Sequence, residues 1–207
     1  MTVTVVTPWL EHRELAQDYW HAMRLANARV IVIDNGSTPP LPNAWRLPTN
    51  TGFSHACNVG LQLATTDAIV WLNNDIAATS SDWLTAITDA LEPGVLVGAN
   101  LRFDAHASVD NVSLPYLDGW CLAGMRDDLL DLGGFDETYQ EPSYFGDNDL
   151  CFRARLAGVT LREVKVGLIH KTNATAGPAA NPKVQAATAA NRARYQQLVR
   201  SALAMAA

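Results

Sequence analysis

The sequence predicts an α/β protein with a mostly parallel central sheet, and three observations indicate this fold class. Short apolar runs recur along the chain, and each is too short for an ordinary helix but typical of a strand buried on both faces. Segments with helical periodicity separate many of these runs, as expected for strands joined by crossover helices. The runs end in polar turns, and in open α/β sheets ligands bind beyond the carboxyl ends of the strands.

The stretch AIVWLNNDIAA, residues 68–78, is the centre of this prediction. Its apolar half predicts the central strand, and Asn73, Asn74 and Asp75 follow where that strand ends. A carboxylate at this edge of the sheet is well placed to hold a divalent metal and a charged ligand. Taken alone, the tripeptide fits a polar turn that caps the next segment somewhat better.

The first half of the chain predicts alternating strands and helices. We expect Pro8 to stop the first strand, because proline cannot donate to a sheet ladder, and Ser80 or Ser81 to cap the third helix. A right-handed crossover would place the ends of the first two strands along the same edge of the sheet. The strands are expected at 3–6, 30–33, 45–47, 68–72 and 95–99, and the helices at 11–26, 53–64 and 82–91.

The second half predicts the same elements at lower regularity. Residues 102–115 show no clear periodicity and are predicted to form a loop. We expect the alanine-rich C-terminal helix to dock on the domain through an apolar face formed by Tyr195, Leu198, Val199 and Leu203. The remaining strands are expected at 120–125 and 159–166, and the remaining helices at 126–132, 147–158 and from 183 onward.

Length and composition indicate one domain with an accessory tail. The 207 residues can bury one good core, and a formal net charge of -6 argues against nucleic acid or an anionic membrane as the main partner. Cys57, Cys121 and Cys151 are expected to be reduced core thiols, which favours the cytoplasm. No apolar run is long enough to span a bilayer, so any membrane association is expected to be peripheral. The composition gives no oligomeric state.

Four stretches, in this order, resemble the family 2 inverting glycosyltransferases of GT-A fold, in particular the rhamnosyltransferase-like bacterial members. They are VIVIDNGST, NTGFSHACNVGLQLATTDAIVWLNNDI, the stretch from GWCLAGMRDDLLDLGGFDETY to YFGDNDLCFRARLAG, and GLIHK. The resemblance implies a nucleotide-binding α/β/α sandwich of GT-A type as a single domain at 1–180. Within it, a nucleotide-binding half at 1–100 would precede an acceptor or catalytic half at 101–180, and residues 181–207 would form a C-terminal helix.

The resemblance also implies residues that bind a nucleoside-diphosphate sugar donor. Asp34 would accept the N3–H of uracil or thymine, which a carboxylate can do because the ring offers one N–H between two carbonyls; the alternative is that Asp34 only stabilises its turn. Asp75 matches the last residue of the metal-binding DxD motif and would hold Mn²⁺ or Mg²⁺. His170 would be a later metal or phosphate ligand, or a structural residue. The donor nucleotide would also contact Thr7, Pro8, Asn58, Asn73 and Asn74.

The catalytic base of the family lies in an E-D-x-D motif, whereas this chain has Gly146-Asp147-Asn148-Asp149. The first glutamate is therefore missing, and Asp147 keeps the position of the base. A helix start should favour its ionised form, while Asp149 would orient the helix or bond the backbone. The resemblance assigns the acceptor and sugar contacts to Asp118, Gly119, Trp120, Asp136, Glu137 and Asp149. Trp120 fits a core position equally well, and Asp136 and Glu137 fit capping residues.

The predicted function is metal-dependent, inverting transfer of a sugar from a UDP- or dTDP-sugar to a hydroxyl of a glycan or other acceptor. Two alternatives remain. A sugar nucleotidyltransferase needs a glycine-rich, basic phosphate loop after the first strand, and residues 7–11 contain neither glycine nor a basic residue. A catalytically inactive nucleotide-sugar binding module is compatible with the glycine at position 146. The residues name neither the sugar nor the acceptor.

Overall fold

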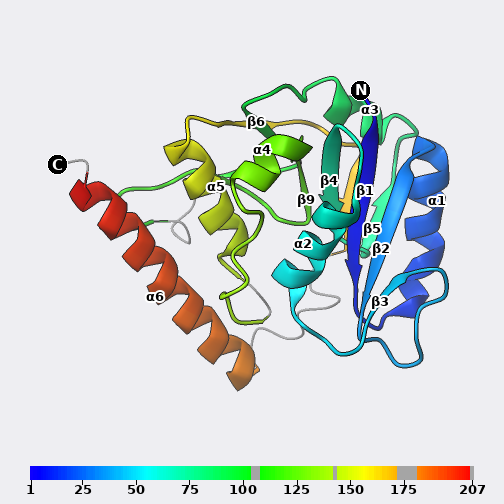
Figure 1. Ribbon diagram of the computed structural model, residues 1–207, viewed down its shortest axis with the longest axis horizontal. Helices are drawn as coiled ribbons and strands as arrows, with labels where there is room; N and C mark the ends of the chain where they lie inside the picture. Colours follow the sequence, from blue (N-terminus) through cyan, green and yellow to red (C-terminus); the bar gives the residue numbers. More distant parts are fainter. Residues whose placement is uncertain (104–107, 142–143, 172–180, 206–207) are drawn as a thin grey trace.

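The computed structural model describes residues 1–103, 108–141, 144–171 and 181–205 and contains a seven-stranded sheet (Figure 1). The strand order is β10-β6-β9-β4-β1-β2-β3, and all neighbours are parallel except β9, which is antiparallel to both β4 and β6. These strands are β1 (Val3–Trp9), β2 (Arg29–Asn35), β3 (Trp45–Leu47), β4 (Ala68–Leu72), β6 (Val95–Gly98), β9 (Cys121–Met125) and β10 (Thr160–Glu163). The predicted fold class is confirmed.

Helices cover both faces of the sheet, so the fold is an α/β/α sandwich (Figure 1). On one face α1 (Ala16–Ala26) and α3 (Trp83–Thr88) pack over side chains such as Val5 and Val70. On the other face α2 (Phe53–Leu63), α4 (Arg126–Asp131) and α5 (Gly146–Leu156) pack over Val6, Ile69 and Trp71. Successive strand residues point to opposite faces, which explains why neighbouring positions enter different cores.

The central strand is β4, as predicted, and all five of its residues are buried. It lies between β1 and β9 and beneath helices on both faces, so no side of it meets water. Two small antiparallel pairs flank the sheet: β5 (Ile76–Ala78) with β11 (Leu168–His170), and β7 (Leu101–Arg102) with β8 (Tyr116–Leu117).

The outermost helix, α6 (Pro182–Met205), packs on the side of α5 that faces away from the sheet (Figure 1). Tyr195 and Val199 are buried in this contact, whereas Leu203, which we expected on the same face, is 46% exposed. The neighbouring Ala202 still packs against the same apolar cluster, so Leu203 lies at the edge of the contact. Among the described helices, none combines the length and apolar character needed to cross a membrane. The three cysteines are buried free thiols, as predicted.

The prediction that Pro8 ends the first strand was wrong. β1 continues to Trp9, and Pro8 pairs with Ile33 of β2. The pairing of β1 with β4 already stops at Val6. Beyond that point β1 has a neighbour on one side only, so a residue without an N–H group is tolerated there.

Other predicted boundaries also need correction. The first helix starts later than residue 11, because Glu11 and His12 have positive φ and a short 3-10 turn (Arg13–Leu15) precedes α1. Strand β5, directly after Asp75, was missed because three residues carry too little pattern. Helix α3 is shorter than predicted and begins after Asp82, with no side-chain cap from Ser80 or Ser81. The predicted loop 102–115 contains an isolated bridge between Val109 and Val112, and its residues 104–107 lie outside the described residues.

We expect Gly36→Ala to destabilise the protein by about 3 kcal/mol or more. Gly36 follows β2 with φ +92°, and a Cβ there would lie 2.5 Å from the backbone nitrogen of Asn50. Both the left-handed backbone and the collision with a main chain that cannot swing aside contribute. Urea unfolding measures the loss. Gly94→Ala is the matched control, since Gly94 has φ +75° with nothing within 4 Å; equal losses in the two variants would show that the close approach costs nothing.

Candidate active site

Many of the predicted functional residues lie at one edge of the sheet, where β1, β2 and β4 end and antiparallel β9 begins. Trp9 of β1 is in register with Asp34 of β2, and Leu72 of β4 is in register with Cys121 of β9. The residues that follow Leu72 and the residues that precede Cys121 therefore emerge side by side. This topology brings the donor-side and acceptor-side predictions to a common edge.

Asp75 and His170 meet at this edge although they are distant in the sequence. Antiparallel pairing of β5 with β11 places His170 opposite Ile76, and the Lys171 N–H donates to the Asp75 carbonyl oxygen (2.8 Å). His170 Nε2 lies 3.0 Å from Asp75 Oδ1, and Asn73 Nδ2 lies 3.3 Å from the same nitrogen. The approach to Asp75 lacks hydrogen-bond geometry, so Oδ1 is buried without a hydrogen-bond partner.

This pair could hold a divalent metal ion. A buried carboxylate oxygen without a donor, beside an imidazole nitrogen, is an oxygen and nitrogen donor set suited to Mn²⁺, and Mg²⁺ is commonly held by one or two carboxylates plus substrate phosphates. Among the described residues no group of three His, Cys, Asp or Glu side chains could hold a metal. Asn74 lies beside Asp75, and its buried Nδ2 also lacks a partner.

Trp120 supports this pair from the β9 side. Its indole ring stacks on the His170 ring, with centroids 4.9 Å apart and an interplanar angle of 7°. Its Nε1–H donates to Asn100 Oδ1 (2.9 Å), and its carbonyl oxygen accepts the N–H of Asn73 (2.8 Å). One face of the indole is therefore covered by imidazole. Trp120 thus contacts both His170 and Asn73, the two residues whose side chains lie next to each other beside Asp75.

Asp147 joins the same cluster from the first turn of α5. Its Oδ2 accepts the Gly119 N–H (2.9 Å), and its Oδ1 accepts the N–H of Asn148 (3.0 Å). A Cβ at Gly119 would lie 3.2 Å from the Asp147 Cβ, so the absence of a side chain there permits the contact. Through Gly119 and Trp120, the predicted base is linked to the predicted metal ligands.

The electrostatics of Asp147 differ from the prediction. Burial of the carboxyl group, assisted by the nearby charge of Asp118 and opposed by the hydrogen bond from Gly119, raises the pKa of Asp147 to about 6. A helix start was expected to favour the ionised form, but the desolvation cost of the charge outweighs the helix dipole. Asp147 is therefore ionised at neutral pH and becomes protonated in mildly acidic solution.

Gly146, where the resemblance leads one to expect glutamate, is not required by packing. A Cβ at this position would meet only Phe135 Cδ1 and Ser54 Oγ, each at an ordinary contact distance of 3.7 Å. The Ser54 hydroxyl is buried without a hydrogen-bond partner. The position has room for a side chain, and neither crowding nor a positive φ explains the glycine.

Asp34 is fully buried and holds the turn that follows β2. Its oxygens accept the N–H groups of Ser37 (2.9 Å) and Leu41 (2.8 Å), and Arg46 Nη1 donates to it at 2.6 Å. Burial would raise its pKa, but these hydrogen bonds together hold the pKa below its usual value. Thr7, on neighbouring β1, is also buried and accepts a hydrogen bond from the Tyr19 hydroxyl (2.8 Å). The turn-stabilising alternative for Asp34 is thus realised in the structure.

Asn58 and Glu137 bind α2 to the segment that follows α4. Asn58 accepts the Phe135 N–H (2.9 Å) and donates to the Phe135 carbonyl and to Glu137 Oε1 (2.8 Å each). His55 Nδ1 lies 2.8 Å from the second Glu137 oxygen. Asp136 accepts hydrogen bonds from Thr138 and Arg194. Each of these side chains has protein partners in this structure, away from the Asp75 cluster.

Asp149 and Asp118 are likewise paired. Asp149, almost fully buried, accepts from Arg153 Nε (2.7 Å) and from the Tyr139 hydroxyl (3.2 Å). Burial raises the pKa of Asp149 despite Arg153. Asp118 pairs with Arg102 through both carboxylate oxygens.

Sequence reasoning missed several residues that build this edge. Arg46 lies in a proline-rich connection, Asn100 lies between the predicted strand 95–99 and the predicted loop, and Arg102 begins that loop. The pattern offered no reason to single them out. Their partners are Asp34, Trp120 and Asp118. Buried charges are usually paired, so a buried Asp34 would have indicated a basic partner, but not which residue it is.

The fold is that of the GT-A glycosyltransferases, as comparison with solved structures shows. A mannosyltransferase of Pyrobaculum calidifontis, in complex with GDP-mannose and Mn²⁺, superposes with a TM-score of 0.66 over 99% of this chain and 80% of its own, at 18% identity. GalNAc-T7 with UDP, GalNAc and Mn²⁺ gives 0.66 over 95% of this chain and 48% of its own, at 16% identity. The catalytic domain of Drosophila β1,4-galactosyltransferase 7 with xylobiose gives 0.56 over 91% and 79%, at 13% identity.

A sequence relative is also a glycosyltransferase. The pre-mycofactocin glycosyltransferase of Mycobacterium tuberculosis is 28% identical, over 72% of this chain and 39% of that protein. The chain therefore spans about two fifths (39%) of the length of the curated relatives that it matches. No protein-family model matches the chain.

Proposed function

We propose that this protein is a metal-dependent, inverting glycosyltransferase that moves a sugar from a nucleoside-diphosphate donor to an acceptor hydroxyl. The observation that carries the proposal is the continuous set of contacts from Asp147 through Gly119 and Trp120 to His170 and Asp75. A carboxylate that could accept a proton and a pair of side chains that could hold a metal thus lie along one chain of contacts. The GT-A fold and the nucleotide sugars and Mn²⁺ of its structural neighbours support the same reaction class.

The proposed reaction is a displacement at the anomeric carbon. The acceptor oxygen forms a bond to that carbon on the face opposite the leaving nucleoside diphosphate, and the configuration inverts. Asp147 takes the proton of the acceptor hydroxyl as the bond forms, which requires its ionised form. Asp75 and His170 would hold the divalent metal, which would supply positive charge against the departing diphosphate. Trp120 keeps the His170 ring in place by stacking on it.

One donor screen separates this proposal from the inactive binding module. For an active enzyme we expect metal-dependent release of nucleoside diphosphate from UDP- or dTDP-sugars. The donor screen is run with Mn²⁺ and measures thermal shift and product release. A protein that binds these nucleotides with metal but never releases product would instead be an inactive binding module. Gly146 keeps this second candidate open, because the acidic residue of related enzymes is missing there.

We further expect UDP and dTDP to bind better than ADP, by about tenfold or more. The reason is the proposed contact between Asp34 and the N3–H of uracil or thymine, which would require the turn at 37–41 to open because Asp34 is buried. Adenine would present an unprotonated ring nitrogen to the carboxylate and leave acceptors unpaired. Calorimetric titration with Mn²⁺ measures the three affinities. Comparable binding of all three nucleotides would remove Asp34 from this role.

A further inference from the structure

Helix α6 is hydrogen-bonded to Gln140, in the segment between α4 and α5, through the buried side-chain amide of Asn191. Gln140 donates its N–H to Asn191 Oδ1 (2.8 Å), and Asn191 Nδ2 donates to the Gln140 carbonyl oxygen (2.8 Å). Asn191 is only 2% exposed. One side chain thus satisfies both main-chain groups of a residue that is distant in the sequence. Buried groups of this kind are costly to leave unpaired, so the amide fixes the position of Gln140 relative to α6.

A second residue of α6 holds the same segment, which we define as the bridging segment, residues 136–141. Arg194 lies one helical turn after Asn191 and donates to Asp136 Oδ2 (2.8 Å). Its guanidinium also lies 5.5 Å from the ring centroid of Tyr139. Helix α6 therefore contacts the bridging segment at Asp136, Tyr139 and Gln140.

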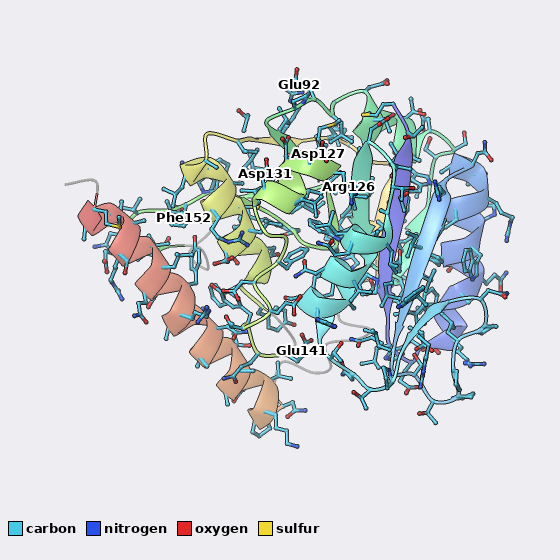
Figure 2. All side chains as sticks on the ribbon, viewed as in Figure 1. Glu92, Arg126, Asp127, Asp131, Glu141 and Phe152 are labelled. Atoms are coloured by element: carbon cyan, nitrogen blue, oxygen red, sulfur yellow. The ribbon has the colours of Figure 1, made fainter. Side chains whose placement is uncertain are left out.

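The bridging segment in turn holds the starts of two helices at the active site. The Tyr139 hydroxyl donates to Asp149 Oδ1 (3.2 Å), near the start of α5, which also carries Asp147. Glu141 Oε1 accepts the N–H of Phe53 (2.7 Å), the first residue of α2. Figure 2 shows Glu141 at this end of α2, and Phe152 on the side of α5 that faces α6. A chain of direct contacts therefore leads from α6 to the turn of the proposed base.

We propose that α6 positions the acceptor side of the active site, with Asn191 as the positioning residue that fixes the bridging segment. The inference rests on the proposed transfer reaction. Apart from Asn58 of α2, which contacts Glu137 of the bridging segment, the proposed donor residues lie at the ends of β1, β2 and β4 and on β11. Releasing the bridging segment should therefore disturb the alignment of Asp147 with an acceptor hydroxyl while the nucleotide still binds. Misplacing reacting groups by about 1 Å can cost on the order of 10²-fold in rate.

The test compares acceptor use with nucleotide binding in the full chain. In Asn191→Ala we expect kcat/KM for p-nitrophenyl glycoside acceptors, with the donor selected by the screen, to fall on the order of 10- to 100-fold. The Kd of UDP with Mn²⁺ should change by less than about twofold. Arg194→Gln, at a side chain that is 48% exposed, should shift kcat/KM in the same direction without threatening the fold. Arg200→Gln is the matched control, because Arg200, further along α6, pairs with Asp110, which lies outside the bridging segment.

Three results would overturn the inference. Unchanged kcat/KM in both Asn191→Ala and Arg194→Gln would show that the bridging segment needs no hold from α6. A parallel loss of UDP affinity, or an equal loss in Arg200→Gln, would indicate a general loss of structure instead of positioning. If Asn191→Ala does not fold, the kcat/KM and UDP affinity of Arg194→Gln alone test the inference. Wild-type protein that transfers no sugar would contradict the proposed function itself. This outcome is distinct from a loss of activity in the variants alone.

Discussion

Asp147→Asn is expected to reduce glycosyl transfer by about 10²- to 10⁴-fold while leaving metal-dependent nucleotide binding nearly intact. An amide has almost the same shape as the carboxylate and keeps an oxygen for the Gly119 N–H. It cannot accept the acceptor's proton in the transition state, so the loss should appear in kcat with little change in donor affinity. Steady-state kinetics and calorimetry with UDP and Mn²⁺ together measure both quantities.

The pH dependence gives an independent readout of the same carboxyl group. Because the pKa of Asp147 in the free protein is about 6, wild-type kcat/KM should fall about tenfold per pH unit below that value, as the base becomes protonated. In the folded protein the pKa lies above its unfolded value, so the native state binds more protons, and ionisation of Asp147 lowers stability as pH rises from about 4 to about 6. Asp147→Asn avoids this charge. At pH 8 its free energy of unfolding should exceed that of wild type by up to about 3 kcal/mol, and its unfolding temperature should be higher.

Two carboxyl variants serve as controls for this assignment. Asp149→Asn should act through the fold, because it weakens the pairing with Arg153 and Tyr139. Glu141→Gln keeps an oxygen for the Phe53 N–H and should retain activity. If Asp147→Asn kept near wild-type turnover while either control lost it, the catalytic base would have to be placed at Asp149 or Glu141.

Asp75→Ala is expected to abolish the enhancement of nucleotide binding by metal. In wild-type protein UDP should bind at least about tenfold more tightly with Mn²⁺ or Mg²⁺ than with chelator, which corresponds to about 1.4 kcal/mol. The physical reason is that a metal held by Asp75 and His170 would neutralise the diphosphate, and only a bridging ion adds differential affinity. In the variant, calorimetry with metal and with chelator should give the same Kd.

The control removes a negative charge nearby without touching the proposed metal ligands. Asp18→Asn breaks the ion pair between α1 and Lys171, the residue next to His170. It should keep the full metal enhancement. Equal UDP affinity with metal and with chelator in the wild-type protein would defeat the bridging role of Asp75, whatever the variants do.

Local pattern was sufficient to predict the framework of this protein. The apolar run of β4 identified the central strand because a strand buried on both faces has no need of polar positions. Strand and helix alternation predicted the sheet class, and the polar residues after the strands predicted one functional edge. Short elements such as β5 escaped, because three residues carry too little periodicity to be distinguished from a turn.

Tertiary structure alone decided how the predicted residues are used. The contacts of Asp147 with Gly119 and of Trp120 with His170 join segments distant in the chain, and no local pattern encodes such pairings. The same holds for Asn191 and Gln140. The pKa of Asp147 shows the physical reason most directly: its position at a helix start is readable from the sequence, but burial, which outweighs the helix dipole, depends on every segment that packs around the carboxyl group.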